Sequence, residues 1–267
     1  MSWIVLRLEL RRSRSLVLWT AVVVAAYGAF IAGFYPIIRD NTKLLDDYMK
    51  VFPKALLAGF GMEGSLSDHG VFFNTYFSSM LWPVVAAMVG AILGTRTVAA
   101  DLDRGFVELP LSTRIDRVRY LAASIWGQLV ALAIVALAAI AGTLAVGAIV
   151  GAGFDAGRFL LVVPLLIGFG CAISAVAMLL SVVTLNRGIS AGIVAGGLIL
   201  MYLLDIVSKL APDLAWLGTV SAFHYLGTIA AIDEGIVPLE GMAVFAAVAV
   251  IAWTASLWGF RRRDLVA

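Results

Sequence analysis

Long uninterrupted runs of hydrophobic residues dominate the chain, and polar residues gather in the segments between them. A helix needs about 20 apolar residues to cross a bilayer core, because its backbone polar groups must bond within the helix. Six runs reach or approach this length, over residues 15–37, 71–94, 121–150, 160–185, 188–204 and 239–260. The pattern therefore predicts an all-α integral membrane protein, with residues 1–267 forming one transmembrane domain.

Composition strengthens this prediction and removes some functions. Hydrophobic residues make up 62% of the chain and charged residues 13%, whereas soluble domains average about 45–50% and about 25%. The central parts of the predicted spans hold no Asp, Glu, Lys, Arg or His. Ionisable groups inside a membrane are typical of proteins that handle protons or ions, so the pattern argues against an ion-coupled pump. The single cysteine, Cys171, permits no internal disulfide and no cysteine-based metal cluster.

Basic residues are distributed unequally among the segments between the spans. A cytoplasmic N-terminus places 13 of the 19 Lys and Arg residues on the cytoplasmic side, and 11 of the 17 acidic residues on the outer side. Cytoplasmic loops carry an excess of Lys and Arg in membrane proteins. Six spans then put both termini in the cytoplasm, in a multi-pass protein of the inner (plasma) membrane.

The N-terminal segment has an amphipathic pattern. Arg7, Arg11 and Arg14 share one face of a helix, while Ile4 and Leu8 mark another face. Such a segment lies along the membrane surface with its apolar side buried in the lipid boundary. It predicts an interface helix that leads into the first span. The other interpretation is that these arginines are only the basic flank of that span.

The segment between the second and third spans, residues 95–120, is the largest charged region on the predicted cytoplasmic side. It is the main candidate surface for a partner protein, and the alternative is an ordinary solvated connection. Its candidate contact residues are Asp101, Asp103, Arg104, Gly105, Glu108, Arg114 and Arg117.

The order of residues in this segment resembles the permease subunits of type-2 ABC exporters, the class that includes antibiotic, drug and polysaccharide exporters. In that family the second span is followed by a stretch similar to E-x-E-x-G-T-x-E-x-L-L-S-x-P-x-x-R. The matching positions are Asp101, Asp103, Gly105, Glu108 and Arg117. The departures are Phe106 in place of threonine, Arg114 in place of proline, and a displaced Pro110.

Two later stretches extend the resemblance over most of the chain. Residues 217–225 are similar to the family's L-S-P-F-x-Y stretch before the last span, with alanine in place of proline. Residues 260–265 read F-R-R-R-D-L and resemble the family's usual F-x-R-R-D-L ending. The order of these motifs together with six spans identifies the chain as a member of this family.

The resemblance implies a permease that forms the translocation pathway as a dimer, with a second copy or a paralogue, and that moves its substrate outward. Two separate ATPase subunits would drive it through residues 95–120 and would bind ATP and Mg²⁺. The sequence agrees, since it has no G-x-x-x-x-G-K-[ST] loop to hold ATP phosphates. We therefore expect a transport subunit in the lipid bilayer, with no catalysis, cofactor, metal or nucleic acid of its own.

Two other functions remain open from the sequence. One is an intramembrane enzyme that uses His224 with nearby outer-loop polar groups, Ser221 and Asp233. A Ser/His/Asp hydrolase usually carries its serine in a G-x-S-x-G turn, and Ser221 does not lie in one. The other is an ATP-independent transporter or scaffold. Co-purification of an ATPase separates the exporter from both.

Overall fold

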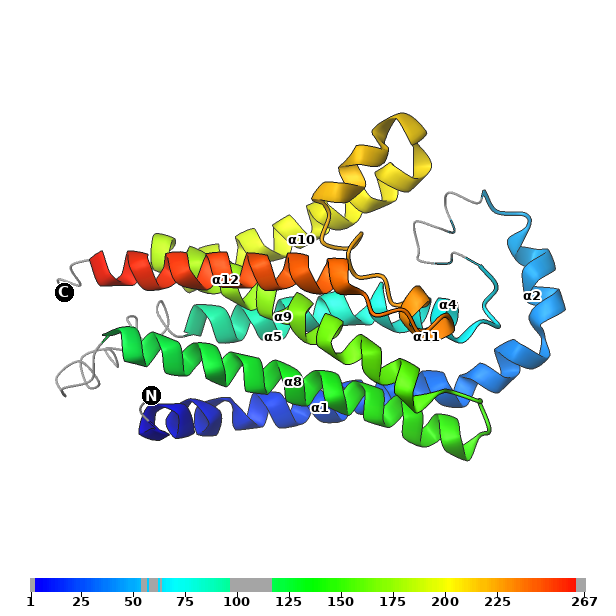
Figure 1. Cartoon of the computed structure of the whole chain (residues 1–267), viewed down its shortest axis with the longest axis horizontal. Helices are drawn as coiled ribbons and strands as arrows, with labels where there is room; N and C mark the ends of the chain where they lie inside the picture. The colour runs from blue at the N-terminus through cyan, green and yellow to red at the C-terminus, as the bar shows by residue number, and fades with distance from the viewer. Residues whose placement is uncertain (1–2, 54–56, 58–61, 63, 97–116, 263–267) are drawn as a thin grey trace.

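The computed structural model describes residues 3–53, 57, 62, 64–96 and 117–262, and every regular element among them is a helix (Figure 1). These elements are α1 (Trp3–Asp40), α2 (Thr42–Met49), α4 (His69–Phe73), η1 (Asn74–Ser78), α5 (Leu81–Thr95), α8 (Arg117–Ile149), α9 (Ala156–Thr184), α10 (Arg187–Leu210), η3 (Pro212–Val220), α11 (Ile229–Asp233) and α12 (Leu239–Arg262).

The long helices confirm the predicted membrane fold. Within the described residues, five helices are long and apolar enough to cross a bilayer, and a bent pair of helices meets the same criteria when its two members are taken together as one span. The start of α1, the end of α5, the start of α8 and the end of α12 lie at one end of the bundle, at the left of Figure 1. The short elements α2, α4 and α11 lie at the other end. The helices therefore run between two distinct ends, as spans must.

The observed helices are longer than the predicted spans at several ends. The predicted interface helix and the first span form one continuous helix, α1, and Arg7, Arg11 and Arg14 are all exposed on its first turns. The fifth span was predicted to end at residue 204, with Asp205 in a loop, but α10 continues to Leu210. Asp205 and Lys209 form an ion pair one turn apart along this helix, which lets the helix continue past the first charge.

The second span is broken near its middle. The π-helix η1 interrupts it, and the segments 69–78 and 81–95 meet at a bend of 40°. Pro83 lies in the first turn of α5, where its missing N–H costs the helix no internal hydrogen bond. Beside the bend, the Thr228 hydroxyl lies 3.1 Å from both Asn74 Oδ1 and Ser78 Oγ. These hydrogen bonds pair polar side chains that are buried.

Helix α9 forms the centre of the bundle. It contacts α5, α8, α10 and α12, and it is the most buried of the candidate spans. Lipid is as apolar as a protein core, so membrane helices associate through close packing of small residues. Gly94 of α5 lies against the backbone of Ser174, and Gly142 of α8 lies against the backbone of Ala25, so closely that an added Cβ atom would overlap either partner. These contacts fix α5 on α9 and α8 on α1.

The short elements at the far end of the bundle are joined by hydrogen bonds. The backbone N–H of Gly70, at the start of α4, donates to Asp233 Oδ1 at 2.7 Å. Arg158, in the first turn of α9, donates to the backbone carbonyl oxygens of Ile232 and Asp233 at the end of α11. Gly70 permits the contact, because a Cβ atom there would meet Asp233 and Ile229. Segments far apart in sequence are thus held together.

Candidate functional site

The candidate partner surface, residues 95–120, is described only at its two ends. Helix α5 ends at Thr95, and α8 begins at Arg117. The candidate residues Asp101, Asp103, Arg104, Gly105, Glu108 and Arg114 lie outside the described residues. Their contact role therefore remains a prediction from the sequence.

The end of α5 and the residue that follows it, where this segment begins, form hydrogen bonds with three other helices. Arg96 Nη1 donates to the backbone carbonyl oxygen of Arg12 in α1 at 3.0 Å. Gln128 of α8 donates to the backbone oxygen of Leu93 at 3.3 Å. Ser181 of α9 donates to the backbone oxygen of Thr95 at 3.3 Å. A displacement of the segment would therefore act on α1, α8 and α9 together.

Gln128, which takes part in these hydrogen bonds, is buried and bonds to a second buried side chain, Ser174. Ser174 of α9 donates to Gln128 Oε1 at 2.8 Å, so Gln128 joins α9 to the end of α5. Gln128 and Ser174 are fully or almost fully buried, where a broken hydrogen bond leaves its partners without water. Gln128 is recognisable in the sequence as a strongly polar residue inside an apolar run, but its partners lie in other helices and no local pattern indicates them.

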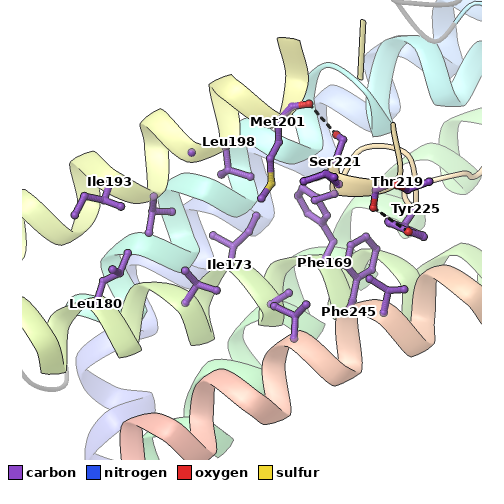
Figure 2. A pocket seen from close by; sticks show the side chains of 18 residues that line it. Phe169, Ile173, Leu180, Ile193, Leu198, Met201, Thr219, Ser221, Tyr225 and Phe245 are labelled. Atoms are coloured by element: carbon purple, nitrogen blue, oxygen red, sulfur yellow. Dashed lines mark hydrogen bonds between the residues drawn. The ribbon is translucent and has the colours of Figure 1, made fainter. Parts of the chain in front are cut away.

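An apolar cavity of about 460 Å³ lies between α9, α10 and α12 (Figure 2). Figure 2 shows Phe169 and Ile173 of α9 facing Leu198 and Met201 of α10, with Phe245 of α12 completing the wall. The connection after η3 closes the cavity on one side. Its polar groups are paired within the wall, since Ser221 donates to the Met201 carbonyl oxygen and Tyr225 to that of Thr219. The cavity is thus suited to apolar groups.

A second cavity, of about 480 Å³, is polar and lies where α10 meets η1 and the connection between η3 and α11. Asp205, Lys209 and His224 line it together with Tyr202 and Phe223. Sequence reasoning missed this cavity, because Asp205 was placed in a loop. The signal that was present is the spacing of Asp205 and Lys209, four residues apart directly after an apolar run.

The candidate enzyme residues take part in separate structural contacts. Ser221 accepts a hydrogen bond from the backbone of Phe223 and donates to Met201. Asp233 accepts from the backbone of Gly70. Among the described residues, no hydrogen bond links His224 to Ser221 or to Asp233. The structure does not bring the three together as a hydrogen-bonded triad.

The apolar helices, the broken second span and the buried interhelical contacts define a multi-pass membrane protein. A search of the curated proteins found no match. Residues 3–265 match the family described as ABC-2 family transporter protein. The chain belongs to this family, and the resemblance read from residues 101–117 and the two later motifs is confirmed.

Proposed function

We propose that this chain is the permease subunit of an ATP-driven exporter in the inner membrane, without catalysis of its own. It pairs with a second permease and with two ATPase subunits, which bind ATP and Mg²⁺. The observation that carries the proposal is the family match along residues 3–265. An ABC-2 permease implies ABC ATPase partners and a place in the membrane, and the motif at residues 101–117 lies where such a partner would act.

The second permease would pack against α10. This helix is the least buried of the candidate spans. Gly192 and Gly196 are exposed, and an added Cβ atom at either would meet nothing within 4 Å. A pair of glycines four residues apart lets two membrane helices approach closely. By contrast, Gly90 and Gly94 have the same spacing but already pack against α9, so the α10 pair is the one left for a partner.

The ATPases would act on the end of the bundle that carries residues 95–120. The start of α1 and the end of α12 lie at the same end, and the excess of basic residues favours a cytoplasmic position for this end. The hydrogen bonds of Leu93, Thr95 and Arg96 would pass a push on the segment to α1, α8 and α9. Movement of these helices against a second permease would open a path between the two subunits.

Co-purification tests the proposal directly. The chain should be isolated from its native membrane under mild conditions with an affinity tag, and its partners identified by mass spectrometry. We expect an ATPase with a G-x-x-x-x-G-K-[ST] loop in stoichiometric amount, and no ATP hydrolysis by the chain alone. The same tag on an unrelated multi-pass protein is the control. Isolation of the chain without an ATPase, with ATP hydrolysis or transport of its own, would contradict the proposal.

A further inference from the structure

The first turns of α1 carry three arginines on a side that faces away from the other helices. Arg7, Arg11 and Arg14 follow one another at intervals of four and three residues, which places them along one face of the helix. All three are exposed, and none of them forms an ion pair with a carboxylate of the described residues. This arginine row (Arg7, Arg11 and Arg14) is therefore a line of cations without a counter-charge in the described part of the chain.

A different face of the same turns packs inside the bundle. Glu9, Ser13 and Val17 are buried there, and Gly127 of α8 lies directly beside Glu9. The Glu9 carboxylate pairs with Arg12 at 3.9 Å, so the acid in these turns is directed to an arginine outside the row. Helix α1 thus has one face fixed on α8 and another, the arginine row, that is directed out of the bundle.

The arginine row continues into a surface of α1 that meets lipid. Leu18 and Val22 extend the same face by one and two turns beyond Arg14, and their side chains are 58% and 56% exposed. Exposed apolar side chains on a membrane span lie against acyl chains, which are as apolar as they are. A lipid whose acyl chain lies along Leu18 and Val22 therefore places its head group at the arginine row.

The arginine row also lies at the depth of the lipid head groups. The apolar part of α1 begins at Leu16, so Arg14 and Arg11 lie about 3 Å and about 7.5 Å beyond it at a rise of about 1.5 Å per residue. The head-group layer is about 5–7.5 Å thick on each side of the hydrocarbon core. Trp126 of α8, next to the contact with Glu9, is exposed at this level, and tryptophan is enriched in the same layer. The outermost arginine can bend its long side chain back toward it.

We propose that the arginine row is a binding surface for anionic phospholipids of the adjoining leaflet, with the phosphate at the guanidinium groups and an acyl chain along Leu18 and Val22. Guanidinium groups offer paired N–H donors that match the oxygens of a phosphate. The head group of a zwitterionic lipid brings a cation of its own that competes with the arginines, so an anionic lipid is preferred. The surface follows from α1 itself and does not depend on the proposed export function.

A protein is the other class of partner that an exposed row of arginines attracts, and the surroundings of the row favour lipid. Leu18 lies only one turn from Arg14 and is itself at the depth of the acyl chains, so lipid borders the row on that side. Figure 1 shows α1 along the lower edge of the bundle, away from α10 at the upper edge. A second permease on α10 would therefore leave this face to the lipid.

Native mass spectrometry of the purified full chain in a neutral detergent tests the proposal. Phosphatidylglycerol and phosphatidylcholine with the same acyl chains are titrated separately, and the dissociation constants of the first bound lipid are compared. A basic residue at an anionic surface contributes about fivefold in affinity, so we expect phosphatidylglycerol to bind at least about tenfold more tightly at low salt. Equal binding of the two lipids would overturn the proposal.

Substitution of the arginine row locates the binding surface. The triple variant Arg7→Gln, Arg11→Gln and Arg14→Gln should reduce the preference for phosphatidylglycerol at least about tenfold, because it removes all three charges. Lysine at the same three positions keeps the charges and should keep most of the preference. The side chains are exposed, so neither variant disturbs the packing of α1. An unchanged preference in the glutamine variant would overturn the site.

A matched control removes the same charge from the other end of the bundle. The variant Arg39→Gln, Lys43→Gln and Lys50→Gln lies there, and Arg39 and Lys50 already pair with Asp40 and Asp47, so the preference should remain. An equal loss in the control would mean that net charge alone decides, and the site would fail. If the glutamine variant of the arginine row keeps its lipid preference but co-purifies with less ATPase, the row is a protein-docking surface and the lipid proposal is wrong.

Discussion

Asp233 joins two segments that are distant in sequence, and its carboxylate accepts the backbone N–H of Gly70 at 2.7 Å. Asp233→Ala removes this acceptor and should lower the free energy of unfolding by about 1 kcal/mol, since the Gly70 N–H is left without its partner. Asp233→Asn keeps a side-chain oxygen at the same position and is the matched control. Thermal unfolding of the purified variants measures the difference, and equal loss in both would show that the charge matters more than the hydrogen bond.

Asp233 should also make the stability of the folded chain depend on pH. Burial raises the pKa of the Asp233 carboxyl, while the Gly70 N–H acts in the opposite direction. The folded chain then holds this proton more tightly than the unfolded chain, so the stabilisation is fullest below the ordinary pKa and is lost as pH rises through the raised value. As pH rises above the ordinary pKa of an aspartate carboxyl, about 4, the unfolding temperature of the wild type should therefore fall relative to Asp233→Asn. A constant difference would contradict this.

At the scale of elements, the contact of α5 with α9 depends on a small residue. A Cβ atom at Gly94 would overlap the backbone oxygen of Ser174 and the neighbouring Ala177, and backbone cannot move aside as a flexible side chain can. Gly94→Ala should therefore destabilise the protein by about 1–3 kcal/mol, the usual cost of overpacking. Unfolding in detergent, followed by circular dichroism, measures this effect.

Gly197 provides the control for this prediction. It lies in α10, and an added Cβ atom there meets nothing within 4 Å. Gly197→Ala should leave stability unchanged or raise it slightly, because alanine restricts the unfolded chain more than glycine does. If both variants lose the same stability, the close approach of α5 and α9 is not what makes Gly94 necessary.

The sequence predicted the number, order and approximate positions of the spans, because each span is a long apolar run and the membrane permits little other than helices. It did not predict the π-helical break at residues 74–80, because the more polar stretch η1, N-T-Y-F-S, is too short to interrupt the long apolar run in which it lies. It also misplaced Asp205, because hydropathy cannot detect a charge that is satisfied within a helix. The break lies beside contacts with Thr228, which is distant in sequence, whereas the ion pair of Asp205 is local.

The partner surface at residues 101–117 and the polar cavity differ in how far the sequence alone could reveal them. Residues 101–117 were recognisable because a family motif is local and needs no tertiary structure. The polar cavity brings Asn74, Asp205 and His224 together from three separate parts of the chain, and no local pattern marks such a set. His224 was considered for catalysis in the sequence, but its neighbours in the cavity are Asp205 and Tyr202 rather than a hydrogen-bonded Ser221 and Asp233.

At the scale of the whole molecule, the exposed glycines of α10 predict the interface of the permease dimer. Replacing both Gly192 and Gly196 by leucine should weaken self-association or pairing with a paralogue on the order of tenfold, because the two helix backbones can no longer approach closely. Ala247→Leu, on an exposed part of α12, is the control. Cross-linking in native membranes measures the dimer, and an undiminished dimer in the double variant would exclude this face.

The second prediction at this scale concerns the candidate partner surface, residues 95–120. The spacing of Asp101, Gly105 and Glu108 places them on roughly one face if the segment is helical, where the carboxylates can accept hydrogen bonds from partner arginines or lysines. Removing one member of a buried interfacial charge pair costs about 2–5 kcal/mol. Glu108→Ala should therefore preserve membrane insertion but reduce the amount of ATPase that co-purifies, or uncouple its hydrolysis from transport.

Glu240→Ala is the matched control, because Glu240 is an exposed acid in the first turn of α12, at the opposite end of that helix from Arg262. It should leave ATPase association unchanged. Arg117→Ala should act like Glu108→Ala, since Arg117 offers a planar pair of donors to a carboxylate of the partner. Retention of normal assembly and ATP hydrolysis by Asp101→Ala, Glu108→Ala and Arg117→Ala would mean that residues 95–120 are only a solvated connection, and the ATPase would then have to contact another surface at this end of the bundle.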